Sequence, residues 1–464
     1  MEINVLKELQ HLISGEMANH YRILPVGNDA GIITFCIDGS LNTSGVKDEL
    51  ELLLGYEVML NSRPSEDILK ALSIYYRTER ETGQKKINID KGDFLENLIQ
   101  EAKSLKSSDI HFEVYDDSAR VRFRIDGQLI ERYKIDHENY LEIVNKIKIR
   151  SKLNITEKRM PQDGRITNES FDIRVSILPT LFGEKIVMRL LGQDASNIDL
   201  STLGFQKNEL DHYLEGVKKP NGIILISGPT GSGKTTTLYA TLRLLNDSRR
   251  NIVTVEDPIE YTLKGVNQVQ LKEDIGLTFA TALKSFLRQD PDIIMLGEIR
   301  DPETALMAIR ASLTGHLVLS TIHTNSAAGT ISRLVDMGVP SYLIAETLNL
   351  SVAQRLLRKL CQECCQETGF SPEAFPKNYK IPYEPKSIFR PVGCNSCYHT
   401  GYKGRIAIYE VLNIDYDTAV SIKNNIIDKL FKDKGHKTLS EKAFDLLSQG
   451  QTSLEEIYSI LINI

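Results

Sequence analysis

The first 76 residues alternate between short helical and short strand-like patterns of apolar residues. Helical periodicity near the start comes first, and Gly55 follows the second helical run as a stop signal. The elements predicted after the start are a strand at Ile32–Ile37, a helix at Val46–Leu54, a strand at Tyr56–Leu60 and a helix at Ile68–Tyr76. The pattern predicts a small α/β domain over residues 1–76.

A polar segment over residues 77–92 separates this domain from the next. It contains Thr-Glu-Arg-Glu-Thr-Gly-Gln-Lys-Lys and almost no aliphatic side chains before Ile87, which is typical of a linker. An amphipathic helix from Asp93 then opens a second α+β domain, predicted over residues 93–195. Its other elements are strands at Ile110–Tyr115, Arg120–Ile125, Asp172–Ile177 and Lys185–Leu191 and a helix at Leu141–Leu153.

After Pro220 the pattern changes to strands that alternate with helical stretches. The predicted strands are Gly222–Ser227, Asn251–Glu256, Asp292–Leu296 and His316–Thr321. Such alternation predicts a parallel sheet with helices on both faces, in a third domain over residues 196–464.

Length, charge and hydropathy limit the possible classes of protein. The 464 residues are too many for one hydrophobic core, and 41% hydrophobic with 25% charged residues is typical of soluble globular chains. The net charge of -6 argues against a broad nucleic-acid footprint, so no direct nucleic-acid partner is expected. No apolar run approaches the ~20 residues that span a bilayer, and the start carries acidic residues where a secretory signal is basic. We expect a cytoplasmic protein.

A glycine-rich loop follows the first strand of the third domain. Residues 228–235 read GPTGSGKT and fit the phosphate-binding pattern G-x-x-x-x-G-K-[ST], with a strand before and a helical run after. In this pattern backbone N–H groups surround the β-phosphate, the lysine reaches the β- and γ-oxygens, and the last hydroxyl binds Mg²⁺. The predicted nucleotide-binding residues are Gly228, Pro229, Thr230, Gly231, Ser232, Gly233, Lys234, Thr235 and Thr236, with Thr235 as the magnesium ligand.

A second apolar strand ends in an acid, where a Walker B element would lie. Residues 292–298 read DIIMLGE, and glycine stands at position 297 where an aspartate is usual. Because Gly297 has no side chain to bind magnesium, Glu298 is predicted to act on the metal's water shell or to polarise the attacking water. The alternative is a strand-end glutamate that only faces solvent.

A third strand runs into acids at the same expected edge of the sheet. Residues 253–260 read VTVEDPIE and place Glu256, Asp257 and Glu260 after the strand. Ligands collect at the carboxyl edge of a parallel sheet, so one of these carboxylates is a candidate general base. The sequence does not say which of them it is.

Two histidines bracket a fourth strand. Residues 314–324 read TGHLVLSTIHT, with His316 before the strand and His323 after it. Both are suited to sensing the γ-phosphate by hydrogen bonding, and a purely structural role for them stays open.

Four of the six cysteines form two C-x-x-C pairs, Cys361/Cys364 and Cys394/Cys397. In a reducing cytosol this spacing suits a metal better than disulfides. Four such thiolates can hold a structural Zn²⁺, which would stabilise a protruding subdomain over residues 361–397 for contact with partners. The alternatives are four reduced thiols packed as small hydrophobes, and Cys365 in place of Cys364 as a ligand.

Taken in order, these motifs resemble those of the ATPases of bacterial type II secretion and type IV pilus assembly. GPTGSGKT, VTVEDPIE, LRQDPDIIMLGEIRD and TGHLVLSTIHT follow the family's order, and SSDIHFE, RFRIDG, KRMPQDGRI, DIRVSILPT and GEKIVMRLL resemble its second N-terminal domain. The resemblance covers nearly the whole chain from Ser108. It implies an α/β fold in which a RecA-like P-loop domain follows α+β N-terminal domains and carries a tetracysteine zinc subdomain.

The resemblance also implies roles for the residues of the site. ATP and Mg²⁺ would bind between the second N-terminal domain and the RecA-like domain. Glu298 would be the Walker B acid and share the magnesium with Thr235. Glu256, Asp257 and Glu260 would belong to an acidic box, and His316 and His323 to a histidine box.

Arginine fingers would come from the second N-terminal domain. Arg159, Arg165, Arg174 and Arg189 cluster there, and we expect Arg165 and Arg174 to stabilise the charge that develops on the γ-phosphate. A guanidinium suits this role because it directs two hydrogen bonds onto phosphate oxygens. The alternative is a solvated basic surface whose arginines pair with neighbouring acids.

The implied setting is a homohexameric motor that assembles a pilus or a secretion pseudopilus. It would be held peripherally at the inner membrane by a platform protein and a docking protein. The assembly and secretion branches carry the tetracysteine module, which retraction motors generally lack. The sequence does not separate type II secretion from type IV pilus assembly or DNA uptake.

Two other functions stay open. One is a nucleic-acid translocase, against which the acidic net charge and the lack of a recognisable DNA-binding module weigh. The other is a regulatory module that binds ATP without turning it over, against which the complete acidic and histidine signatures weigh.

Overall fold

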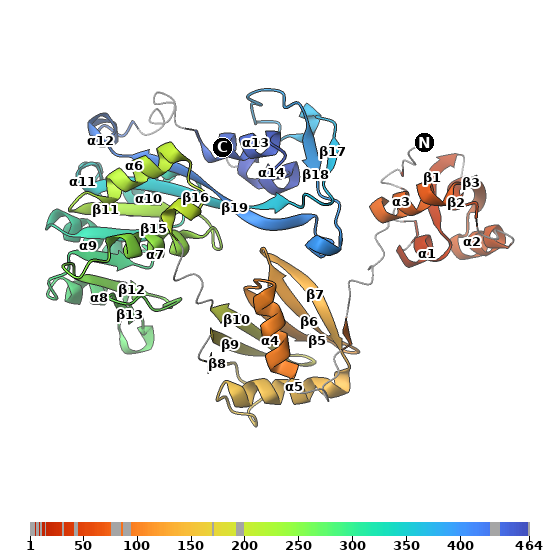
Figure 1. Ribbon diagram of the computed structural model, residues 1–464, viewed down its shortest axis with the longest axis horizontal. Helices are drawn as coiled ribbons and strands as arrows, with labels where there is room; N and C mark the ends of the chain where they lie inside the picture. The colour runs from red at the N-terminus through yellow and green to blue at the C-terminus, as the bar shows by residue number, and fades with distance from the viewer. Residues whose placement is uncertain are drawn as a thin grey trace. The chain divides into compact units, whose positions relative to one another are not determined.

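The chain forms two compact units, Met1–Gln84 and Lys85–Ile464. The computed structural model describes residues 5, 9, 12–13, 15–29, 32–40, 45–75, 85–86, 94–168, 171–191, 199–426 and 437–462, and Figure 1 shows their helices and strands. Across these residues, we find no helix with the length and apolar character needed to cross a membrane.

The first unit is built on a three-stranded sheet of order β1-β2-β3, with β2 antiparallel to β1 and parallel to β3. Its elements are α1 (Gly15–His20), β1 (Ile23–Asp29), β2 (Ile32–Asp38), α2 (Val46–Leu54), β3 (Glu57–Arg63) and α3 (Ser65–Tyr75). The predicted stop of α2 is correct, because Gly55 has a φ of 70° and donates its N–H to Glu51 O. The sequence pattern did not predict β1, and the helical periodicity near the start falls largely outside the described residues.

The predicted linker over residues 77–92 also lies outside the described residues, except for Lys85 and Lys86. These two form a short strand, β4, which pairs in parallel with β7 (Gln128–Ile135). This part of the predicted linker therefore belongs to the second unit.

The second unit opens with a seven-stranded sheet of order β4-β7-β6-β5-β10-β9-β8. Its other elements are α4 (Phe94–Ser104), β5 (Asp109–Val114), β6 (Ala119–Ile125), α5 (His137–Arg150), β8 (Gln162–Asn168), β9 (Phe171–Thr180) and β10 (Gly183–Leu191). The strict alternation of β6 directs Val121 and Phe123 into a core with Leu98 of α4 and Ile147 of α5. The intervening arginines of β6 lie on the other face of the sheet.

A second seven-stranded sheet, of order β13-β12-β14-β15-β11-β16-β19, carries the predicted phosphate loop. Its strands are β11 (Gly222–Ser227), β12 (Ile252–Glu256), β13 (Asn267–Gln270), β14 (Ile293–Leu296), β15 (Leu317–Ile322), β16 (Leu348–Leu360) and β19 (Tyr402–Asn413). The predicted parallel sheet is confirmed from β13 to β16, whereas β19 is antiparallel to β16. The sequence pattern did not predict the two long strands β16 and β19, of which β19 lies at the edge of the sheet.

The central strands of this sheet are buried on both sides, because helices cover both of its faces. Successive residues of β11 enter different cores: Ile223 packs with the helices on one face, and Ile224 packs with α6 and α7 on the other. The helices are α6 (Lys207–Val217), α7 (Lys234–Leu245), α8 (Phe279–Phe286), α9 (Pro302–Leu313), α10 (Ala327–Asp336), α11 (Ser341–Thr347), α12 (Tyr416–Lys423), α13 (Leu439–Ser448) and α14 (Leu454–Ile462). The architecture is the predicted α/β class.

Candidate functional site

The glycine-rich loop joins β11 to α7 and closes tightly against β16. Gly228 has a φ of 149°, and a Cβ there would lie 2.5 Å from Gln354 O. Gly233 has a φ of 89°, and a Cβ there would lie 2.8 Å from Gln354 Nε2. Both positions therefore require glycine, for backbone conformation and for space.

Lys234 is the first residue of α7, and its side chain folds back over the loop. Nζ donates to Gly228 O at 2.8 Å and to Pro229 O at 3.1 Å. Burial lowers the pKa of Lys234, although the nearby Glu298 carboxylate acts in the opposite direction. Thr235 is exposed and Thr236 is half-buried at the start of the same helix. The ammonium is thus held inside the loop by two neutral carbonyl groups.

Glu298 follows β14 and reaches the same edge of the sheet as the glycine-rich loop. Its carboxylate forms an ion pair with Arg300, and Glu298 Oε2 lies 3.2 Å from His323 Nε2. The preceding residue, Gly297, lies close to β12, and a Cβ there would be 3.4 Å from Glu256 Cα, in van der Waals contact.

The two histidines around β15 lie at opposite ends of that strand. His323 follows β15 and lies at the same edge of the sheet as Glu298. His316 precedes the strand, where its backbone oxygen accepts from Gly222 N at the start of β11 and its Nδ1 lies 2.8 Å from Ala311 O. Because β11 and β15 are parallel, the length of the strand separates His316 from the glycine-rich loop. The contacts of His316 within this chain are those of a helix end, and its interpretation as a γ-phosphate sensor stays a prediction.

The acids after β12 have different surroundings. Glu256 is 3% exposed and accepts hydrogen bonds from Tyr239 Oη, from Thr254 Oγ1 at 2.6 Å and from Gln268 Nε2 at 3.1 Å. Burial, and then Glu256, raise the pKa of Tyr239 well above its usual value, so this phenol stays protonated as a donor. Glu256 thus has the contacts of a buried structural acid.

Glu260 and Asp257 lie further along the same segment. Asp257 is exposed, and Glu260 Oε2 lies 3.8 Å from Arg174 Nη1. Arg174 also donates to Ile259 O. The acidic segment is therefore in direct contact with an arginine of β9.

Three arginines lie side by side across neighbouring strands of the first seven-stranded sheet. Arg165 of β8 is directly opposite Arg174 of β9, which is directly opposite Arg189 of β10. Arg174 and Arg189 line a cavity of about 440 Å³ together with Pro258 of the acidic segment. Arg165, whose side chain is 60% exposed, instead forms an ion pair with Asp172.

Sequence reasoning missed two side chains of the site, Gln354 and Arg355 of β16. Gln354 is buried, and its Oε1 accepts from Thr237 Oγ1 at 2.9 Å. Arg355 Nη1 would lie 3.1 Å from a Cβ at Gly228. The adjacent polar residues Gln354 and Arg355 within the strand were the available signal, but only the pairing of β16 with β11 shows that they meet the loop.

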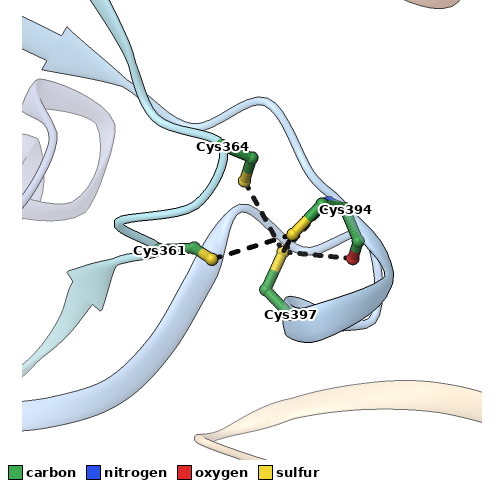
Figure 2. A group of neighbouring side chains, drawn as sticks. All are labelled: Cys361, Cys364, Cys394 and Cys397. Atoms are coloured by element: carbon green, nitrogen blue, oxygen red, sulfur yellow. Dashed lines mark hydrogen bonds between the residues drawn. The ribbon is translucent and has the colours of Figure 1, made fainter.

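The four paired cysteines converge at one point between two loops, as Figure 2 shows. Cys361 follows β16, Cys394 precedes a short 3-10 turn (Asn395–Cys397), and Cys397 is the last residue of that turn. Their Sγ atoms all lie within 4.8 Å of one another, with separations of 3.8 Å for Cys361 to Cys394, 3.8 Å for Cys364 to Cys397 and 3.7 Å for Cys394 to Cys397. A regular tetrahedron with zinc–sulfur bonds of about 2.3 Å has edges of about 3.8 Å, so the donor set fits zinc.

Backbone N–H groups support these sulfurs as they would support thiolates. Gly393 N donates to Cys364 Sγ at 3.3 Å, and Cys394 N and Gly401 N donate to Cys397 Sγ at 3.2 and 3.3 Å. Cys365 is outside the cluster, so the structure favours Cys364 over Cys365 as the fourth ligand. Four protein sulfurs leave no open coordination position, which is typical of a structural site.

Comparison with known proteins identifies the family. A family profile described as type II/IV secretion system protein matches residues 87–459. The type IV pilus assembly ATPase of Myxococcus xanthus is 39% identical over 502 aligned positions, which cover 98% of this chain and 87% of that protein. The type II secretion system ATPase E of Vibrio cholerae is 43% identical over 370 positions, which cover 78% of this chain and 74% of that protein.

Solved structures show the same fold. The pilus retraction motor PilT with bound ADP superimposes with a TM-score of 0.55 at 26% identity, covering 78% of this chain and 96% of that one. The ATPase DotB of Legionella pneumophila superimposes with a TM-score of 0.60 at 21% identity, covering 82% of this chain and 99% of that one. The family profile matches most of this chain, and the two relatives align with most of this chain and with most of their own length. This chain therefore belongs to the type II/IV secretion system protein family.

Proposed function

We propose that this chain is an ATP-hydrolysing motor that works as a homohexamer and powers assembly of a pilus or of a secretion pseudopilus. The observation that carries the proposal is the position of Lys234, in the loop between β11 and α7, at the same sheet edge as the Glu298–His323 pair. This edge combines a phosphate-binding loop with an acid that can act on water, and the family relatives named above are ATPases.

Binding of the nucleotide would be carried by the glycine-rich loop. The residues are Gly228, Pro229, Thr230, Gly231, Ser232, Gly233, Lys234, Thr235 and Thr236. Lys234 would exchange the carbonyl oxygens of Gly228 and Pro229 for the β- and γ-phosphate oxygens, which compensate its charge better. Thr235 and Glu298 would hold Mg²⁺, directly or through its waters, and the bound ion would neutralise phosphate charge.

Hydrolysis would depend on Glu298. Its carboxylate would orient and polarise the attacking water, and His323 would hold the carboxylate in position through the hydrogen bond to Oε2. Glu256 was a candidate for the same task, but three donors and full burial give it the contacts of a scaffold. Glu260 would act through Arg174, its ion-pair partner.

The arginines of the first seven-stranded sheet would complete the site. Arg174 is the best candidate for this role, because it already contacts the acidic segment through Ile259 O and Glu260. Arg165 lies next to it in register and would have to leave Asp172 to reach a phosphate. Guanidinium groups suit the charge that develops during phosphoryl transfer.

The zinc subdomain would have a structural task. Cys361, Cys364, Cys394 and Cys397 would hold Zn²⁺, which would keep the loops around residues 361–397 folded for contact with a partner. An inner-membrane platform protein and a cytoplasmic docking protein would hold the motor at the membrane. The net charge of -6 disfavours the alternative of a motor that acts on nucleic acid.

Steady-state release of phosphate from ATP by the purified chain tests the enzymatic part of the proposal. Release that requires Mg²⁺ and is lost in Lys234→Ala is expected. In the source bacterium, replacing the gene by the Lys234→Ala form should abolish surface pili or the export of secreted proteins. If the wild-type chain binds ATP without releasing phosphate, the regulatory alternative replaces the motor.

A further inference from the structure

Glu410 of β19 is a buried carboxylate that joins the starts of two helices. It is 3% exposed, and its Oε1 accepts from Ala327 N of α10 at 2.7 Å, while its Oε2 accepts from Leu439 N of α13 at 3.1 Å. Burial raises the pKa of Glu410, although the two N–H groups and the nearby Lys442 and Arg355 cations act in the opposite direction. Because a carboxylate is stabilised by the positive end of a helix dipole, this side chain holds the two helix starts together.

The start of α10 is also the end of the short segment that carries His323. We call residues 323–327, which join β15 to α10, the histidine segment. It begins with His323, whose Nε2 lies 3.2 Å from Glu298 Oε2, and it ends with Ala327, which donates to Glu410. Glu410 is thus connected to the acid proposed for hydrolysis through one short stretch of backbone.

Contacts from two neighbouring strands fix the histidine segment. Ser351 Oγ of β16 donates to Ala327 O at 2.8 Å, and Arg355 Nη2 of the same strand donates to Asn325 O at 3.1 Å. The hydrogen bond from Ala327 N to Glu410 adds β19 and α13 to these supports. Like the contact made by Arg355, it includes a charged group, and such hydrogen bonds are stronger than neutral ones.

Strand pairing places Glu410 at the edge of the sheet that carries the site. Glu410 is directly opposite Ala353 of β16, which is directly opposite Ser227, the last residue of β11 before the glycine-rich loop. We propose that Glu410 is a positioning residue, which binds Ala327 N and thereby keeps His323 within reach of Glu298. The proposal rests on the function proposed above, because His323 and Glu298 act in that reaction.

The assignment gives α13 a part in hydrolysis. Glu410 binds the first N–H of α13 with one oxygen and the first N–H of α10 with the other. A displacement of α13 would therefore disturb the carboxylate that supports the histidine segment. In this way the C-terminal part of the chain would influence turnover through the protein itself.

Steady-state phosphate release by the full-length chain with Mg²⁺-ATP tests the assignment. A glutamine has one acceptor oxygen, so in Glu410→Gln an NH₂ group would face one of the two N–H groups. This variant should lower kcat about tenfold and leave the KM for ATP nearly unchanged. Glu410→Asp keeps two acceptor oxygens and should restore part of the loss. In the double variant Glu410→Gln/His323→Ala, turnover should be no lower than in His323→Ala, because Glu410 acts through His323.

Glu209→Gln is the matched control, because Glu209 is another buried carboxylate of the same domain. It accepts from Gln206 N at 3.0 Å and forms an ion pair with Lys442, and its described contacts do not include the histidine segment. This variant should lower the midpoint of thermal unfolding without a comparable loss of kcat. Glu410→Asp replaces Glu410→Gln if the latter unfolds.

Amide exchange of the histidine segment gives a readout that does not depend on hydrolysis. Exchange there should be faster in Glu410→Gln than in Glu209→Gln. Equal exchange in these two variants, or losses of turnover that multiply in the double variant, would show that Glu410 does not position His323. If the wild type releases no phosphate, the proposed motor function fails, and the exchange measurement alone then supports or overturns the positioning role.

Discussion

His323 Nε2 lies 3.2 Å from Glu298 Oε2, although the two residues are 25 positions apart in the chain. They meet because β14 and β15 are parallel neighbours whose carboxyl ends lie at the same edge of the sheet. A second contact, from Thr321 Oγ1 to Gly297 O at 2.7 Å, ties the two strand ends together. The histidine is thus placed to act on the acid by strand pairing.

Replacing His323 by alanine should lower turnover by ~10²-fold, within the range for groups that assist proton transfer, and leave ATP affinity nearly unchanged. The reason is that His323 contacts Glu298 and makes no contact with the glycine-rich loop in the described structure. His316→Ala is the matched control. It removes a contact to Ala311 O and should cost ~1 kcal/mol of stability without a comparable loss of turnover. Equal losses of turnover in both variants would contradict the placement. Phosphate release and thermal unfolding provide the measurements.

The arginines make a second prediction. Arg174→Ala and Arg165→Ala should each fold and bind ATP yet lose turnover by ~10³-fold or more, as removal of an arginine finger does. Arg159→Ala is the control, because its side chain is 89% exposed and pairs only locally with Glu157. Measured turnover near the wild-type value for Arg165→Ala would assign Arg165 to its ion pair with Asp172. The same result for both variants would remove the arginine fingers from the account.

The tetracysteine cluster makes a third prediction. The purified chain should contain about one zinc per molecule, and Cys394→Ser should lower the zinc content and the resistance of residues 361–397 to proteolysis, because a tetrahedral ligand is lost. Cys365→Ser is the control and should retain the metal. Elemental analysis of protein purified without chelator is the measurement. Absence of metal in the wild type would restore the interpretation of four packed thiols.

Glu113 makes a prediction about pH. Burial acts to raise its pKa, but hydrogen bonds from Arg122 and Arg120 outweigh this and lower it from 4.5 to about 2. A pKa lowered in the folded state stabilises the fold above the ordinary value, and this stabilisation is lost as the pH falls from 4.5 toward 2. Amide exchange protection of β5 and β6 should therefore fall between pH 5 and pH 3, and less so in Glu113→Gln. An equal fall in both proteins would show that Glu113 is not responsible.

Local motifs allowed much of the site to be predicted from the sequence. The glycine-rich loop, Glu298 and the cysteine pairs are each defined by short spacings, and the structure brings each group together as expected for its chemistry. The α/β class and the parallel strands followed from hydrophobic runs of strand length separated by helical stretches.

Residues placed by long-range pairing could not be predicted in the same way. Gln354 and Arg355 reach the glycine-rich loop because β16 pairs with β11, more than 100 positions earlier. The position of His316 depends on the direction of β15, which a list of neighbouring residues does not show. The alignment of Arg165 with Arg174 depends on the register of β8 and β9. Register and direction come from the whole sheet, whereas the motifs come from a few adjacent residues.

The central claim is that Glu298 acts in hydrolysis at a site where Lys234 binds the phosphates. Steady-state phosphate release, measured with Mg²⁺-ATP on wild type, Glu298→Gln and Lys234→Ala under conditions where ATP binding is also recorded, tests it most directly. The account predicts that Glu298→Gln binds ATP like the wild type but releases phosphate at least ~10²-fold more slowly, and that Lys234→Ala fails already in binding. Phosphate release by Glu298→Gln at the wild-type rate would contradict the account.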